Sequence, residues 1–279
     1  MEWIDRLNDA MEYVEERLTG EITLEGAARR AACSPYHFQR MFPYMTGMAF
    51  SEYVRRRRMT AAAMELTGGA KVIDIAAKYG YESPTAFNRA FQSIHGVPPR
   101  AARTRGAALR AYPRITFTLS IKGESAMEYR IVERKGFRVV GFGTGEPMTM
   151  EDCFEKVPRF WAERGGDIPR LCALMDGTEP RGVLGVSACD GGQFSGYYIA
   201  VATERPAPEG MDEYTVPAGT WAVFPCSGPV PEAMQALQKR IITEWLPSSG
   251  YEYAAAPDIE VYAADNYNHE VWLPIVKAK

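Results

Sequence analysis

Two stretches with the same layout decide the fold of the N-terminal part of the chain: SPYHFQRMF at residues 34–42 and SPTAFNRAF at residues 83–91. In each stretch a serine can cap a helix, and a proline follows at the first helical position, where its missing N–H costs nothing. Phenylalanines recur at helical spacing on one side of each predicted helix, and polar residues lie mostly on the other. The stretches therefore predict two amphipathic helices of the same design.

Each of these stretches follows a predicted short helix and a tight turn. Residues 23–28 and 72–76 predict the two short helices. A short helix, a turn and a second helix with a polar free face form a helix-turn-helix, whose second helix enters the DNA major groove. Apolar residues at helical spacing add a leading helix over residues 4–18 and a connecting helix over residues 49–67. We predict an all-α double helix-turn-helix over residues 1–108.

The net charge of −3 averages over two parts of opposite sign. Residues 20–110 hold 14 Lys and Arg against 6 Asp and Glu, a balance of +8, whereas residues 111–279 hold 16 against 23, a balance of −7. Such asymmetry indicates that the basic part contacts nucleic acid. Arg40 and Arg89 occupy matching positions in the two helices, where an arginine can read a guanine edge or hold a phosphate.

The composition, with 46% hydrophobic and 24% charged residues, is that of a globular protein and excludes a disordered chain. No apolar stretch reaches the roughly 20 residues of a membrane span, and the N-terminus lacks the pattern of a signal peptide. The five cysteines form no CxxC pair, which argues against a zinc site and a disulfide framework. We expect a cytoplasmic protein with no metal, no cofactor and no membrane contact.

The C-terminal part reads as a duplicated α+β domain over residues 126–279, after a basic linker over residues 109–125 that ends in a strand at 115–119. Alternating patterns predict a hairpin at residues 128–142 and a second at 213–224. Each hairpin precedes an amphipathic helix and two further strands. The predicted helices cover 151–164 and 230–245, and the predicted strands cover 184–188, 197–202, 259–262 and 270–275. We therefore predict a multi-domain chain whose second domain consists of two β-β-α-β-β repeats.

The first stretch, residues 34–42, resembles the first recognition helix of AraC-family transcription regulators. Residues 75–99 resemble the family's signature over its second helix-turn-helix, and the resemblance covers about residues 5–105. It implies two recognition helices on promoter double-stranded DNA and activation through contact with RNA polymerase. The predicted DNA-binding residues are the family-matched or outward-facing ones: Tyr36, His37, Gln39, Arg40, Thr85, Asn88 and Arg89. Pro43 departs from the family pattern, and we expect a kink or an early end of the first helix there.

Three segments, residues 217–224, 244–252 and 270–275, resemble GyrI-like effector-binding domains, which are fused to AraC-type readers in Rob-like regulators. This resemblance implies a cleft between the repeats, with aromatic walls and a buried glutamate that faces cationic, planar ligands. The candidate effector-binding residues are Trp161, Tyr198, Trp221, Phe224, Glu260, Tyr262 and Trp272. Glu260 alternates with Ile259 and Val261 and so shares a strand face with Asp258 or Tyr262. Glu270 is its rival as the pocket carboxylate.

The resulting hypothesis is a sequence-specific DNA-binding transcription regulator, an activator, controlled by a small lipophilic effector, with cations as one candidate class. We expect no enzyme and no catalytic residues, since the chain holds no GxSxG, P-loop or HExxH motif. One alternative is a GyrI-like hydrolase that acts on a bound electrophile, in which Glu260 and Tyr197 or Tyr198 activate water. Another is a C-terminal domain that docks only a protein partner.

Overall fold

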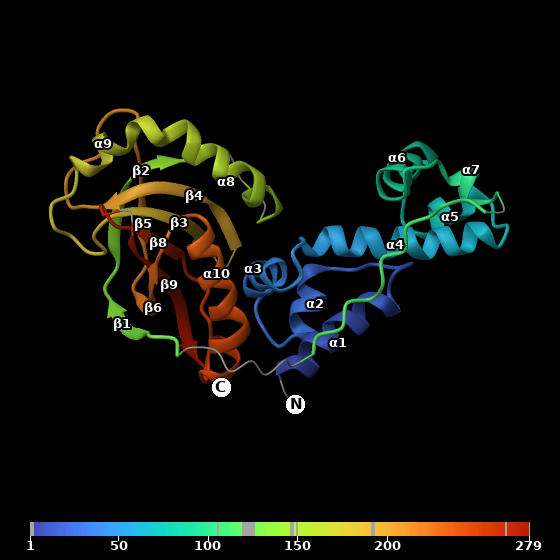
Figure 1. The fold of residues 1–279 in the computed structure, drawn as a ribbon, viewed down its shortest axis with the longest axis horizontal. Coiled ribbons are helices and arrows are strands. Elements are labelled where there is room, and N and C mark those ends of the chain that lie inside the picture. The colour runs from blue at the N-terminus through green and yellow to red at the C-terminus, as the bar shows by residue number, and fades with distance from the viewer. Residues whose placement is uncertain are drawn as a thin grey trace. The chain divides into compact units, whose positions relative to one another are not determined.

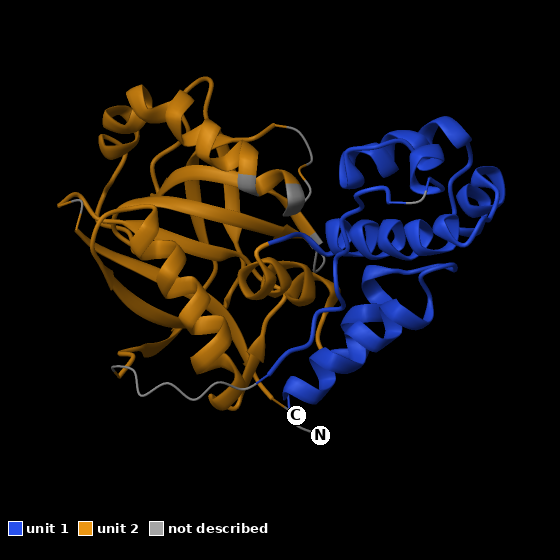
Figure 2. Ribbon diagram, turned by 45° about the vertical axis from the view of Figure 1, so that its right-hand side comes forward, with its two compact units in different colours: residues 1–32, 48–121 blue, residues 33–47, 122–279 orange. Residues whose placement is uncertain are grey.

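The computed structural model describes residues 3–104, 106–118, 126–145, 148, 150–190, 193–265 and 267–278, and every structural statement below concerns these residues. Contacts divide the chain into two compact units. Unit 1 comprises residues 1–32 and 48–121, and unit 2 comprises residues 33–47 and 122–279 (Figure 2). No helix in this described part is long and apolar enough to cross a membrane.

Unit 1 is helical, as the sequence predicts. Its helices are α1 (Trp3–Glu16), α2 (Leu24–Arg30), α4 (Phe50–Thr67), α5 (Val72–Lys78), α6 (Pro84–His95) and α7 (Pro99–Ala102) (Figure 1). The Ser83 hydroxyl accepts a hydrogen bond from the Ala86 N–H at 3.1 Å and caps α6, as expected of a Ser-Pro start. Gly80, with φ +78°, makes the turn between α5 and α6. The fully buried rings of Phe87 and Phe91 anchor α6 in the core.

Arginines of the run at residues 55–58 form an ion pair and hydrogen bonds within unit 1. Arg57 forms an ion pair with Glu15 at 2.7 Å, and Arg58 donates to the carbonyls of Leu18 and Gly20. The predicted strand at residues 115–119 is wrong over 115–118, because the Phe117 backbone forms hydrogen bonds with a side chain of α1, that of Asn8. Leu119 lies outside the described residues. Residues 109–118 therefore belong to unit 1, although the sequence predicts a linker there.

Unit 2 contains α3 (Pro35–Thr46) and a nine-stranded antiparallel sheet with its helices (Figure 1). The strands are β1 (Arg130–Arg134), β2 (Phe137–Gly143), β3 (Val183–Asp190), β4 (Gln193–Ala202), β5 (Asp212–Val216), β6 (Gly219–Ser227), β7 (Tyr251–Tyr253), β8 (Asp258–Tyr262) and β9 (Asn268–Lys277). The other helices are α8 (Met150–Arg164), α9 (Ile168–Cys172) and α10 (Glu232–Arg240), which continues as a π-helical turn over Ile241–Trp245.

The sheet confirms the duplication but corrects the predicted hairpins. The strand order is β1-β6-β9-β8-β3-β4-β2-β5, with β7 beside β9. If each strand is replaced by its counterpart in the other repeat and the order is then read backwards, the same order results. The hairpins at residues 128–142 and 213–224 are wrong, because β1 pairs with β6, and β2 pairs with β5. Only two residues join β1 to β2, about 11 Å of chain, so the sheet curls to bring its ends together.

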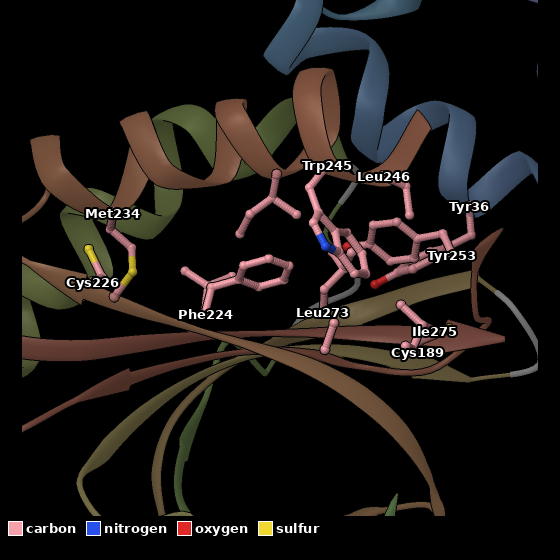
Figure 3. Packing of buried hydrophobic residues seen from close by; sticks show 13 residues of the cluster. Tyr36, Cys189, Phe224, Cys226, Met234, Trp245, Leu246, Tyr253, Leu273 and Ile275 are labelled. Carbon is pink, nitrogen blue, oxygen red and sulfur yellow. The ribbon is translucent and has the colours of Figure 1, made fainter. Parts of the chain in front are cut away.

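The two faces of the sheet carry different cores, set by strand alternation. One face holds a cluster that includes Leu184, Trp221, Ile259 and Trp272. The other face is covered by helices, with α8 and α9 over β3 and β4, and α10 over β6 and β9. Figure 3 shows part of the helix-covered core around Phe224, Trp245 and Leu273. On β8, Asp258, Glu260 and Tyr262 lie on the helix-covered face, as the alternation predicts.

Removing the cap of α6 should loosen that helix selectively. In Ser83→Ala the Ala86 N–H loses its acceptor, at a cost of about 1 kcal/mol. Hydrogen exchange of the α6 amides should therefore speed up by about fivefold. The exposed Ser93 of the same helix provides the control, since Ser93→Ala should leave the exchange rates unchanged. Equal rates in the two variants would contradict a capping role for Ser83.

Candidate functional site

Helix α6 presents a polar face to solvent. Thr85 and Arg89 are exposed and Asn88 is partly exposed, while Phe87 and Phe91 point into the core. A helix-turn-helix needs this arrangement, with apolar residues fixing the second helix and polar residues free to meet base edges. The three residues predicted on this helix are thus placed together on its accessible side.

The matching residues of α3 are in a different situation. Ser34 caps α3 by accepting from the His37 N–H at 3.1 Å, but Tyr36 and His37 are only 2% and 5% exposed. Gln39 is partly exposed, and the Arg40 side chain is 10% exposed. The early end expected at Pro43 is wrong because α3 continues to Thr46. Tyr36, His37 and Arg40 are therefore not open to DNA in this conformation, although the sequence predicts them as readers.

Arg40 forms a buried ion pair inside unit 2. Its Nη2 lies 2.5 Å from Oδ2 of Asp258, and its Nη1 donates to the Ser187 hydroxyl at 3.3 Å. Asp258 also accepts from the hydroxyl of Tyr253. Burial raises the pKa of the Asp258 carboxyl, and the Arg40 guanidinium opposes that rise by stabilising the carboxylate. The pair holds α3 onto β8.

Aromatic contacts add to this hold on α3. The His37 ring lies 4.8 Å from that of Tyr253, and the Tyr36 ring meets the same residue edge-on at 6.1 Å. Figure 3 shows Tyr36 beside Tyr253 in the helix-covered core. Burial lowers the pKa of His37 to about 3, so its imidazole is neutral here.

Glu260 is the centre of a second polar cluster, two residues along β8. Its Oε2 accepts from the hydroxyls of Tyr197 at 3.2 Å and Tyr262 at 2.9 Å, and its Oε1 accepts from the Gln238 amide at 2.7 Å. The Tyr44 hydroxyl of α3 donates to the Gln238 carbonyl oxygen at 2.7 Å. Burial, followed by the nearby Glu260 charge, raises the pKa of both Tyr197 and Tyr262, so the two phenols stay protonated.

A cavity of about 330 Å³ opens beside Glu260. Its walls come from α3, α8, β3, β4, α10 and β8. The residues that line it are Arg40, Pro43, Tyr44, Cys153, Val157, Pro158, Ser187, Tyr197, Gln235, Gln238, Lys239 and Glu260. Its carboxylate and its apolar and aromatic walls suit a lipophilic cation, while Arg40 and Lys239 add positive charge to the lining.

Three of the predicted effector-binding residues meet at this cluster. Trp161 donates its indole N–H to the Tyr197 hydroxyl at 3.0 Å, and its ring lies 4.9 Å from that of Tyr262. Tyr262 in turn donates to Glu260. The sequence pointed to Tyr197 only in the hydrolase alternative, not as an effector-binding residue, and it missed Gln238. Tyr197 is the strand neighbour of the predicted Tyr198, and alternation decides which of them faces the cavity, whereas nothing in the sequence distinguishes Gln238.

Of the other four predicted effector-binding residues, three are buried in the core and Tyr198 is partly buried against it. Tyr198, Trp221 and Trp272 belong to the cluster on the opposite face of the sheet, where strand alternation turns them away from Glu260. Phe224 faces the helices but is fully buried against Trp245, 4.9 Å away. None of these four residues lines the cavity beside Glu260.

Glu270, the rival carboxylate, lies near the surface, where it pairs with Arg130 at 2.7 Å and is 28% exposed. It does not line the cavity. Groups of three or more His, Cys, Asp or Glu side chains able to hold a metal are absent from the described part of the chain.

Comparison with known proteins accounts for both parts of the chain. Residues 130–275, more than half of the chain, match the family model of the integron-associated effector binding protein, Cass2, and residues 27–105 match a helix-turn-helix domain. The chain belongs to the Cass2 family. Its solved relatives include an integron cassette protein of Vibrio cholerae, which is 20% identical with a TM-score of 0.41, over 53% of this chain and 95% of that one.

A second solved structure, SAV2435 bound to tetraphenylphosphonium, is 23% identical with a TM-score of 0.48, over 54% of this chain and 94% of that one. The N-terminal part is 36% identical to the transcriptional activator AarP of Providencia stuartii, over 35% of this chain and 73% of AarP. It is 32% identical to the multiple antibiotic resistance protein MarA of Escherichia coli, over 35% of this chain and 77% of MarA. The AraC-type domain and the GyrI-like effector-binding domain inferred from sequence are thereby confirmed.

A glycine permits the close approach at the centre of the Cass2 domain. A Cβ added at Gly185, which pairs with Glu260 across β3 and β8, would lie 2.1 Å from the Tyr197 hydroxyl. Gly185→Ala should therefore displace Tyr197 and cost about 1–3 kcal/mol, a fall in Tm of roughly 4 °C or more. Gly166→Ala places its methyl group in open space and should leave the Tm within about 1 °C. Differential scanning calorimetry of both variants tests this, and equal Tm values would refute the close packing.

Proposed function

We propose that this protein activates transcription from specific promoters in the cytoplasm, with α6 as its standing DNA reader and RNA polymerase as its partner. The observation that carries the proposal is the exposed polar face of α6, with Thr85, Asn88 and Arg89 on one accessible side of an AraC-type helix-turn-helix. Arg89 suits a guanine and Asn88 suits an adenine, because each side chain can form paired hydrogen bonds to those bases.

We further propose that the Cass2 domain binds a lipophilic cation in the cavity beside Glu260. The three groups that donate to this carboxylate are two protonated phenols and an amide, none of which neutralises its charge. The negative charge remains able to attract a cation, and Tyr44, Val157 and Tyr197 of the cavity lining supply aromatic and apolar contact. Glu260, rather than the surface residue Glu270, is the effector carboxylate in this proposal.

The hydrogen bond between Tyr197 and Glu260 also supports the alternative of a hydrolase, in which these two groups position water against a bound electrophile. Incubation of the protein with activated esters, followed by mass spectrometry of the products, separates the two functions. Turnover that Glu260→Gln abolishes would favour the enzyme over the sensor.

Removal of the Arg89 guanidinium should weaken specific DNA binding. A good paired contact to a base is worth about 1–3 kcal/mol, so Arg89→Ala should raise the Kd for a selected duplex by roughly 5- to 150-fold. Arg17→Ala removes the same type of charge just after α1, from a side chain that is 41% exposed, and should change the Kd less than twofold. Gel-shift titrations at one fixed salt concentration measure both variants. A normal Kd for Arg89→Ala would exclude Arg89 from the reader.

Neutralising Glu260 should affect cations selectively. Glu260→Gln keeps the shape of the side chain but removes its charge, and should weaken tetraphenylphosphonium binding by about tenfold, or 1.4 kcal/mol. Binding of the neutral triphenylphosphine oxide should stay within about twofold. Glu270→Gln makes the same charge change near the surface and should leave both affinities unaltered. Tryptophan fluorescence quenching measures all four, and equal losses for the two ligands in Glu260→Gln would contradict the electrostatic role.

A further inference from the structure

The residues that α3 would use to read DNA are the residues that fasten it to the Cass2 domain. Tyr36 and His37 pack against Tyr253, and Arg40 pairs with Asp258 at 2.5 Å. A side chain held in this way cannot also reach a base edge in the major groove. Reading by α3 and docking of α3 onto β8 therefore exclude each other.

The docking place of α3 adjoins the proposed effector site. Arg40, Pro43 and Tyr44 form one wall of the cavity whose other walls include Glu260 and Tyr197. The Tyr44 hydroxyl reaches Glu260 through Gln238, by hydrogen bonds of 2.7 Å each. A molecule that draws Glu260 or Gln238 toward itself removes a contact of α3.

We propose that α3 is an internal occupant of the effector-binding domain, and that a lipophilic cation bound beside Glu260 displaces it and frees its reading face for DNA. The inference rests on the proposed function, which it extends by naming the coupling between the two sites. Arg40 places the chain's own cation in the wall of the cavity, where it pairs with Asp258 at 2.5 Å. An external cation drawn to Glu260 enters the cavity against the charge of Arg40 in its wall, and effector binding becomes release of a DNA-reading helix.

Release of α3 can be measured by the reactivity of cysteines that the chain already contains, so no cysteine has to be introduced. Cys33 precedes α3, and burial raises the pKa of its thiol to about 12, while Cys189 lies with Tyr36 in one core cluster. Both thiols should react faster once α3 leaves. Cys172 is exposed and serves as the rate reference, and Cys226 is buried under α10 and reports whether the domain stays folded.

The experiment compares thiol labelling rates at pH 8 by mass spectrometry in the full-length chain. Asp258→Asn removes the partner of Arg40, so Cys33 and Cys189 should react at least about tenfold faster while Cys226 stays protected. Asp190→Asn makes the same change at an exposed position of β3 and should leave all rates unaltered. Saturating tetraphenylphosphonium should accelerate the same two thiols in the wild-type chain.

Slower or unchanged labelling of Cys33, with the cation shown to be bound by tryptophan quenching, would overturn the inference and leave the proposed effector site intact. Should Asp258→Asn expose Cys226 through unfolding, Tyr44→Phe is the second variant. It removes only the hydroxyl that donates to Gln238 and should accelerate Cys33 by a smaller factor, about threefold. Unchanged Cys33 labelling in Tyr44→Phe would likewise overturn the inference.

A DNA-binding experiment distinguishes two failures: that the effector does not release α3, and that the protein does not read DNA. Selection from random duplexes should yield one short motif with the wild-type chain, read by α6, and two motifs about 10 base pairs apart with Asp258→Asn. Two motifs with both proteins would refute the internal docking of α3 but support DNA reading. No motif with either protein would refute the proposed DNA-reading function itself, whereas the thiol rates report on the docking independently.

Discussion

Arg40 and Asp258 bury opposite charges under α3, so neither can move away without leaving the other uncompensated in a place with little water. Transfer of each ion from water costs several kcal/mol, and loss of one partner of such a pair typically costs about 3–5 kcal/mol. Ser187 accepts a further hydrogen bond from Arg40, and Tyr253 donates one to Asp258. The orientation of α3 follows from this constraint, and the burial of Tyr36 and His37 follows from the orientation.

The twofold arrangement of the sheet explains why such a place exists. Strands β3 and β8 meet at the centre of the order, where the two repeats join. Helix α8 covers one repeat and α10 covers the other, so the helix-covered face of β8 lies where the two coverings meet. Alternation then sets Asp258 toward α3 and Glu260 toward the cavity, two residues apart on one strand. One short strand thus supplies both the carboxylate that pairs with α3 and the carboxylate that lines the cavity.

Local patterns in the sequence predicted what is local in the structure. The serine caps, the polar face of α6 and the side of β8 that carries Glu260 all depend on neighbours within a few residues, and these predictions are confirmed, whereas the predicted free face of α3 is buried. The hairpins failed because partner choice between strands depends on closure of the whole sheet, which two nearly equal repeats can satisfy by exchanging strands. The sequence placed Trp221 and Trp272 at the effector site for a related reason. An aromatic residue on a strand can pack on either face of the sheet, and these two pack on the face opposite Glu260.

Helices α3 and α6 show how one motif supports two situations. Both begin with Ser-Pro and carry an arginine six residues after the serine, yet Arg89 is exposed and Arg40 is not. The difference lies in the residues after the proline, Tyr36 and His37 in α3 against Thr85 and Ala86 in α6. Tyrosine and neutral histidine can bury an aromatic ring against Tyr253, and each also carries a polar atom that can form hydrogen bonds. Threonine and alanine have no aromatic ring to bury. Burial keeps His37 neutral by lowering its pKa to about 3, so the charge that these three side chains bring to the contact is that of Arg40.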